Sequence, residues 1–153
     1  NNNRTVANIR SYFNKANAML DLLELLLKLE TGNGEFINAG DEYKSIELKD
    51  VETVNLRLKE IENLYEKAIE LESDFYLAWF NMAIVLGEQR DFNASLEAYS
   101  KAIKINEDFK EAYLNRGVNY LFLENPKKAC SDFSKAGELG LSEAYKIIKK
   151  YCK

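Results

Sequence analysis

Residues 79–136 contain one pattern of large and small residues twice, with a period of 34 residues. When the chain is shifted by that period, large side chains match large ones and small match small. The matched pairs are Trp79 with Tyr113, Asn81 with Asn115, Ala83 with Gly117, Leu86 with Tyr120, Tyr99 with Phe133, Lys101 with Lys135 and Ala102 with Ala136. A fixed period of about 20 to 50 residues is typical of stacked repeats, because one unit cannot bury its apolar face alone.

Each unit reads as two helices. Its large residues recur at spacings of three and four, which places them on one stripe of a helix. The 153 residues include only one proline and seven glycines, so few positions interrupt helical structure, and 46% of the chain is hydrophobic. The sequence therefore predicts an all-α protein with one compact domain.

The two units resemble the tetratricopeptide repeat, and the resemblance covers residues 76–143. It implies a right-handed superhelical stack of antiparallel helix pairs. The first unit departs from the family pattern at the final proline, where Glu107 stands. The second departs there with Leu141, and it has Arg116 at the position of a leucine. The residues that carry the resemblance are Trp79-x2-Met82-Ala83-x2-Leu86 with Ser95-x3-Tyr99-x2-Ala102, and Tyr113-x2-Arg116-Gly117-x2-Tyr120 with Ala129-x3-Phe133-x2-Ala136.

The rest of the chain is expected to extend this stack at both ends. We predict repeats at 76–109 and 110–143, a capping helix within 142–153, and an N-terminal helical segment, 1–75, that includes a degenerate first repeat and a long loop at 31–49. Ile61, Tyr65 and Ala68 match the second helix of a repeat, but no matching first helix precedes them closely. We expect the helix predicted over 5–30 to take that place.

Several residues indicate where helices begin and end. Asn125-Pro126 is a strong start signal, with asparagine as the N-cap and proline at the first helical position. Asp74, Asp108 with Glu111, and Ser142 are further predicted caps. In the final helix, predicted over 143–152, Tyr145, Ile148, Tyr151 and more weakly Ile147 are expected to face the preceding repeat, and Lys146, Lys149, Lys150 and Lys153 to face water. This closing stretch resembles the terminal unit of bacterial tetratricopeptide proteins.

Charge and hydropathy argue against several classes of partner. The net charge is −4 and no long block of lysine and arginine occurs, so nucleic acid is not expected to bind. The most apolar run, residues 19–29, is interrupted by Asp21, Glu24 and Lys28, which argues against a membrane span. The first residues lack the apolar core of a signal peptide. The compartment, cytoplasmic or periplasmic, stays open.

Catalysis and metal binding are not expected. The chain has no histidine and two cysteines, so the commonest general base and the usual metal-ligand sets are missing. No phosphate-binding loop or nucleophile motif occurs, and no cofactor is predicted. Two buried free thiols are the default interpretation of Cys130 and Cys152, and a disulfide between them is the alternative.

The resemblance implies that a peptide lies in the concave groove formed by the first helices of the repeats. Asn81 and Asn115 occupy a position where the family often hydrogen-bonds a peptide backbone. Phe80 and Leu114 stand where the variety that clamps a C-terminal carboxylate needs lysine, so that clamp is absent and an apolar helix or strand is favoured. The implied groove residues are Leu77, Phe80, Asn81, Ile84, Gly87, Glu88, Glu111, Leu114, Asn115, Val118, Leu121 and Phe122.

The predicted function is therefore non-catalytic binding of a protein or peptide. The alternative is structural self-association, as a homodimer for example, with the groove filled by the chain's own N-terminal segment. Arg116 also has two interpretations, because it could meet a ligand carboxylate or pair with Glu88 or another nearby acid.

Overall fold

The computed structural model describes residues 2–30 and 51–152, with the side chains of 5–23 and 52–152. This part of the chain consists of helices and short turns, without a strand. The helices are α1 (Asn2–Glu30), α2 (Val51–Leu71), α3 (Tyr76–Glu88), α4 (Phe92–Ile105), α5 (Lys110–Phe122), α6 (Pro126–Glu138) and α7 (Ser142–Tyr151). The predicted loop at 31–49 lies outside the described residues. No helix in the described ranges is long and apolar enough to cross a membrane.

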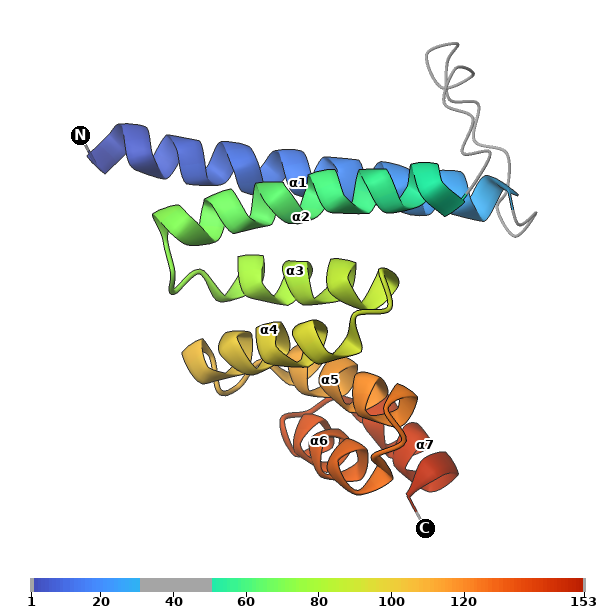
Figure 1. The fold of residues 1–153 in the computed structure, drawn as a ribbon. Helices are drawn as coiled ribbons and strands as arrows, with labels where there is room; N and C mark the ends of the chain where they lie inside the picture. Colours follow the sequence, from blue (N-terminus) through green and yellow to red (C-terminus); the bar gives the residue numbers. More distant parts are fainter. Residues whose placement is uncertain (1, 31–50, 153) are drawn as a thin grey trace.

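The helices form a stack in which each packs against the next along the chain. Figure 1 shows α1 and α2 side by side at one end, α3 and α4 in the middle, and α5, α6 and α7 at the other end. The predicted all-α stack of antiparallel helix pairs is confirmed.

Helix α1 takes the place of a first helix in this stack. The Phe13 ring lies 6.0 Å from that of Tyr65 and 4.6 Å from that of Phe75, measured between centroids. The Phe80 ring makes the same two contacts one unit later, at 5.7 Å from Tyr99 and 4.6 Å from Phe109. Since Tyr65 and Phe75 precede Tyr99 and Phe109 by 34 residues, α1 packs on α2 and α3 as α3 packs on α4 and α5.

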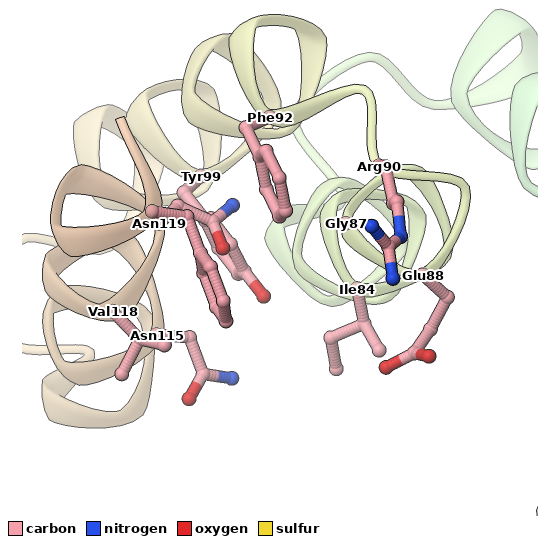
Figure 2. Close-up of a pocket in the computed structure, with 10 residues that line it drawn as sticks. Ile84, Gly87, Glu88, Arg90, Phe92, Tyr99, Asn115, Val118 and Asn119 are labelled. Atoms are coloured by element: carbon pink, nitrogen blue, oxygen red, sulfur yellow. The ribbon is translucent and has the colours of Figure 1, made fainter. Parts of the chain in front are cut away.

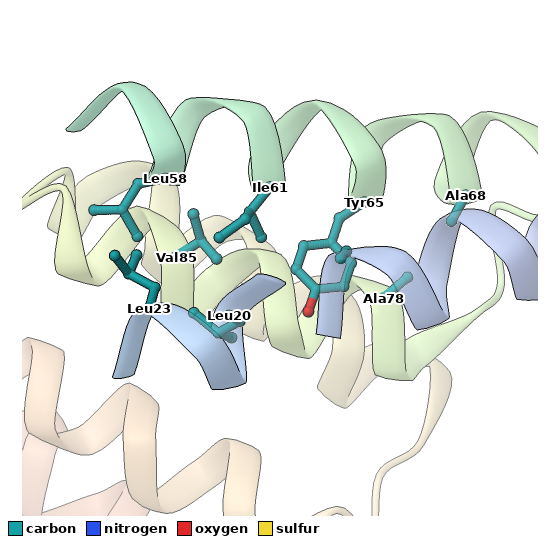
Figure 3. Packing of buried hydrophobic residues seen from close by; sticks show 9 residues of the cluster. Leu20, Leu23, Leu58, Ile61, Tyr65, Ala68, Ala78 and Val85 are labelled. Atoms are coloured by element: carbon teal, nitrogen blue, oxygen red, sulfur yellow. The ribbon is translucent and has the colours of Figure 1, made fainter. Parts of the chain in front are cut away.

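The buried core runs through the stack as a chain of apolar contacts. Leu20 and Leu23 of α1 meet Leu58, Ile61 and Tyr65 of α2, with Val85 of α3 in the same cluster (Figure 3). A second cluster joins α3, α4 and α5 through small residues and one large ring, and includes Ala83, Leu86, Ala98, Tyr99 and Ala112. Burying these side chains provides the main free energy that holds neighbouring helix pairs together.

Two kinds of helix start alternate along the stack. The predicted start at Asn125-Pro126 is confirmed, because the Asn125 side chain accepts a hydrogen bond from the Lys128 amide at 3.2 Å. Asp91 caps α4 in the same way through the Ala94 amide, at 3.1 Å. These side chains satisfy backbone donors that a helix leaves unpaired at its start.

The three other predicted caps are wrong. The N-cap residues of α3, α5 and α7 are Phe75, Phe109 and Leu141, and none makes a side-chain capping hydrogen bond. Phe75 and Phe109 pack their rings on the preceding first helix instead. Burial of a large ring at the N-cap therefore positions these helices in place of a capping side chain.

Cys130 and Cys152 form a disulfide, so the default interpretation of two free thiols is wrong. Their Cα atoms lie 5.7 Å apart although 22 positions separate them in sequence. Helix α7 runs antiparallel to α6, which brings the residue after α7 next to the first turns of α6 (Figure 1). The disulfide therefore ties the capping helix to the last repeat.

Candidate functional site

A cavity of about 480 Å³ lies between α3 and α5 and is bounded by α4. Figure 2 shows Ile84 and Glu88 on one side, Asn115 and Val118 on the other, and the rings of Phe92 and Tyr99 entering from α4. The lining residues are Ile84, Gly87, Glu88, Arg90, Phe92, Tyr99, Asn115, Val118, Asn119 and Phe122. Most of this wall is apolar, and a small number of polar groups point into it, as is common in ligand-binding cavities.

Two polar groups, the Tyr99 hydroxyl and the Asn115 amide, meet at this cavity. Tyr99 is only 4% exposed, and burial raises the pKa of its hydroxyl above the ordinary tyrosine value. A hydrogen bond with the Asn115 side chain acts in the opposite direction on that pKa. The hydroxyl is therefore neutral at physiological pH and can donate a hydrogen bond.

The equivalent pair one unit earlier has a third partner. Asn17 of α1 accepts hydrogen bonds through Oδ1 from the Tyr65 hydroxyl at 2.5 Å and from the Asn81 amide nitrogen at 2.9 Å. Asn17 lies four residues after Phe13, and Ile84 lies four residues after Phe80, so Ile84 takes the place of Asn17 in the next seam. Isoleucine offers no acceptor, and Tyr99 and Asn115 line the cavity instead.

Two aromatic rings form one end of the cavity. Phe92 and Phe122 stack with their centroids 4.8 Å apart and their planes 6° from parallel. Phe122 is 64% exposed, although it is a large apolar residue. Exposed aromatic rings beside a cavity are typical of binding surfaces.

A buried polar chain holds the back of the cavity in place. The Asn119 amide nitrogen donates to Ser95 Oγ at 2.6 Å, and Ser95 Oγ donates to the Ala83 carbonyl at 2.5 Å. These bonds link α5, α4 and α3. The sequence analysis did not identify this chain, but a signal existed, because Asn119 stands where the earlier unit has Val85 and Ser95 where it has Ile61.

Half of the predicted groove residues line this cavity. They are Ile84, Gly87, Glu88, Asn115, Val118 and Phe122. Phe80 packs in the core against Tyr99 and Phe109, and Asn81 already donates to Asn17. Leu77, Glu111 and Leu114 are not among the residues that line this cavity or the second groove described next. Arg90, Phe92, Tyr99 and Asn119 belong to the cavity and were not predicted, because the family pattern points only to first helices.

A second groove, of about 610 Å³, lies between α5 and α7. It is lined by Val118, Leu121, Phe122, Lys146, Ile147, Lys150 and Tyr151, so it includes the remaining predicted residue, Leu121. Two predictions for α7 need correction. Lys146 and Lys150 line this groove rather than merely facing water, and Tyr145 and Tyr151 are 58% and 47% exposed rather than buried. The buried residue of α7 is Ala144, since only a small side chain fits against α6.

Arg116 pairs with an acid inside the stack, as one of its two interpretations held, but that acid is Asp132 rather than Glu88. Its Nε and Nη2 atoms donate to the two carboxylate oxygens at 2.8 and 2.7 Å, and Nη1 donates to Ser100 Oγ at 3.0 Å. The hydrogen bond from Asp132 raises the pKa of Arg116 above its ordinary value. Arg116 therefore joins α4, α5 and α6 and lines neither cavity.

The described residues include no group of three or more cysteine, aspartate or glutamate side chains placed to hold a metal ion.

Comparison with known proteins places the fold. The tetratricopeptide repeat profile matches residues 76–109. The Arabidopsis OM64 TPR domain is 27% identical, with a TM-score of 0.57 over 62% of this chain and 83% of that one. The first TPR of Spaghetti (RPAP3), solved bound to the HSP90 peptide SRMEEVD, is 21% identical, with a TM-score of 0.59 over 62% of this chain and 77% of that one. YrrB, described as a TPR protein with an unusual peptide-binding site, is 22% identical, with a TM-score of 0.57 over 63% and 53%.

One curated sequence is also similar. It is the UDP-N-acetylglucosamine–peptide N-acetylglucosaminyltransferase of Giardia intestinalis (strain ATCC 50803 / WB clone C6), which is 36% identical over 73 residues. That match spans 48% of this chain but only 5% of the transferase. The similarity therefore concerns a small part of that protein.

Proposed function

This chain is a tetratricopeptide repeat protein, and from that premise we propose that it binds an apolar peptide segment of a partner protein in the cavity between α3 and α5. The family is generally a non-catalytic interaction module. The similar RPAP3 domain was solved with a bound peptide, which supports a peptide as the class of ligand.

One observation carries the proposal, namely the difference between two equivalent seams. At the α1–α3 seam, the chain itself supplies the Asn17 carbonyl oxygen to Tyr65 and Asn81. At the α3–α5 seam, Tyr99 and Asn115 line an open cavity with Ile84 opposite. A peptide carbonyl could accept from both donors as Asn17 does in the earlier seam. Its apolar neighbours could then pack on Ile84, Val118 and the Phe92–Phe122 stack.

The experiment selects binders from a displayed library of random 12-residue peptides and measures their affinity by fluorescence polarisation. We expect Asn115→Ala to weaken binding about fivefold, since one hydrogen bond of ordinary strength is lost. Phe122→Ala should weaken it about tenfold, as truncation of an aromatic anchor does. Asn93→Ala is the matched control, because Asn93 is exposed on α4 and lines neither cavity.

Retained affinity in both cavity variants would contradict the proposal, as would a selection that yields no peptide. Circular dichroism of each variant checks that the fold is intact. Phe80 is unsuitable as a test position, because its ring is part of the core and a charge there would disrupt folding.

Self-association remains the second candidate, favoured by a group of exposed apolar residues at the C-terminal end. Phe122, Leu123, Tyr145 and Tyr151 are all exposed. If these residues join two copies, Phe122→Glu will convert a dimer to a monomer in light scattering. Filling of the cavity by the chain's own N-terminal segment has no support from the described side chains of α1, none of which lines it. Residues 31–50 lie outside the described part.

A further inference from the structure

The groove between α5 and α7 combines an apolar surface with two lysines. Lys146 and Lys150 are four residues apart on α7 and so lie on one side of that helix. Both line the groove beside Ile147 and opposite Leu121 of α5. No acidic residue is among the seven that line it.

These two ammonium groups have no acidic partner in the described part of the chain. The ion pairs found there join Arg57 to Glu60, Lys59 to Glu62, Arg116 to Asp132 and Lys135 to Glu138. Lys150 lies over the ring of Tyr151, with Nζ 4.9 Å from the centroid, and this contact leaves its charge uncompensated. A positive site therefore occurs on a chain whose net charge is −4.

The groove is also continuous with the cavity of the proposed function. Val118 and Phe122 of α5 line both. A peptide that packs on Phe122 from the cavity side would reach the lysines next if it continued along this face. The shared wall favours one peptide over two unrelated ligands, and the lysines define the charge that its second part should carry.

We propose that the groove between α5 and α7 is an acidic-peptide subsite, in which Lys146 and Lys150 bind a carboxylate of the ligand while an apolar side chain packs on Ile147 and Phe122. This inference rests on the proposed function and adds to it. The ligand has an apolar part for the cavity and an aspartate, glutamate or terminal carboxylate for the groove. Charge complementarity at such a rim contributes mainly specificity and association rate.

The test uses peptides selected from the same 12-residue library. We expect them to contain an acidic residue to one side of the apolar positions. The variant Lys146→Gln/Lys150→Gln should weaken their binding roughly 3- to 10-fold, as expected for two exposed charge contacts. The control Lys127→Gln/Lys149→Gln changes the net charge equally at exposed lysines outside the groove and should leave affinity unchanged.

A second measurement tests direct pairing. Peptides whose acidic residues are replaced by asparagine or glutamine should bind wild type as weakly as the parent peptide binds the groove variant. The two changes together should cost less than the sum of their separate effects, because they remove one interaction. Raising the salt concentration should weaken only the pair that keeps both charges.

The outcomes separate this inference from the proposed function. If selected peptides lose affinity with Phe122→Ala but contain no acid, or bind the groove and control variants equally, the acidic subsite is wrong and peptide binding stands. If no peptide is selected, both are wrong. If a fluorescent 12-nucleotide single strand binds wild type and is lost with Lys146→Gln/Lys150→Gln while acidic peptides are unaffected, the lysines serve phosphates and the inference is overturned.

Discussion

The unit formed by α3 and α4 and the unit formed by α5 and α6 share one packing plan but use different chemistry at matched positions. The first unit places Met82 and Ala98 in or against its apolar cluster. The second places Arg116 and Asp132 at these positions and joins them by two short hydrogen bonds. The same backbone arrangement therefore accepts an apolar pair or an ion pair, and the sizes of the side chains matter more than their polarity.

A second difference concerns how closely the two helices of a unit approach. The first unit has Ala83 where the second has Gly117. A Cβ atom at Gly117 would lie 2.5 Å from Cε1 of Phe133, which is fully buried. The second unit has given up one methyl group to bring a phenylalanine ring against the backbone of α5.

The largest expected effect comes from removing one member of the ion pair. Asp132→Ala leaves the Arg116 guanidinium, whose side chain is only 18% exposed, without its acid. We expect a loss of about 3 kcal/mol in the free energy of unfolding, measured by urea denaturation, because an uncompensated charge stays partly buried.

The double variant Arg116→Met/Asp132→Ala copies the first unit and should recover most of that loss, since apolar replacements of buried ion pairs are often neutral. Lys135→Ala is the control, because its pair with Glu138 is exposed and 4.0 Å long. A double variant as unstable as Asp132→Ala would show that the two units do not share one packing plan.

The next effect concerns the close approach at Gly117. Gly117→Ala should lower the free energy of unfolding by about 2 kcal/mol, because the new methyl group overlaps the Phe133 ring. Gly87→Ala is the matched control on α3. Its Cβ would meet nothing closer than 3.6 Å, and alanine is the better helix former, so no loss is expected. Equal effects at the two glycines would refute this account of the second unit.

The smallest effect concerns a feature that the two units share. Arg90 and Glu124 are 34 residues apart, and both follow a first helix with a positive φ, of 62° and 54°. Glycine adopts this conformation without strain. Glu124→Gly and Arg90→Gly should each raise the free energy of unfolding by about 0.5 kcal/mol. Glu97→Gly, inside α4, should lower it. A gain at only one of the two turns would show that their backbones differ in solution.

Much of the fold was predictable because it depends on local patterns. Periodic apolar residues and the 34-residue period predicted the helices and their stacking, and Asn125-Pro126 predicted the start of α6. The caps at Asp74 and Asp108 were wrong because Phe75 and Phe109, the next residues, gain more by packing on the preceding first helix than an aspartate gains by capping.

The site was predictable only in part, because it depends on residues from three helices. The repeat pattern identified Ile84, Asn115, Val118 and Phe122, which lie on first helices. It could not identify Phe92 and Tyr99, because these belong to a second helix that enters the cavity only after packing. It also placed Phe80 and Asn81 in the groove, although tertiary contacts use Phe80 for the core and Asn81 for a bond to Asn17.

The sequence by itself determined that this chain forms antiparallel helices in a repeating stack, because helix period and residue size act over a few neighbouring residues. Only the tertiary structure decided which seam is bridged by Asn17, which is left with a cavity beside Ile84, where the two lysines of α7 lie and that the two cysteines meet. These outcomes depend on distances between side chains far apart in sequence, and such distances are set only when the helices pack.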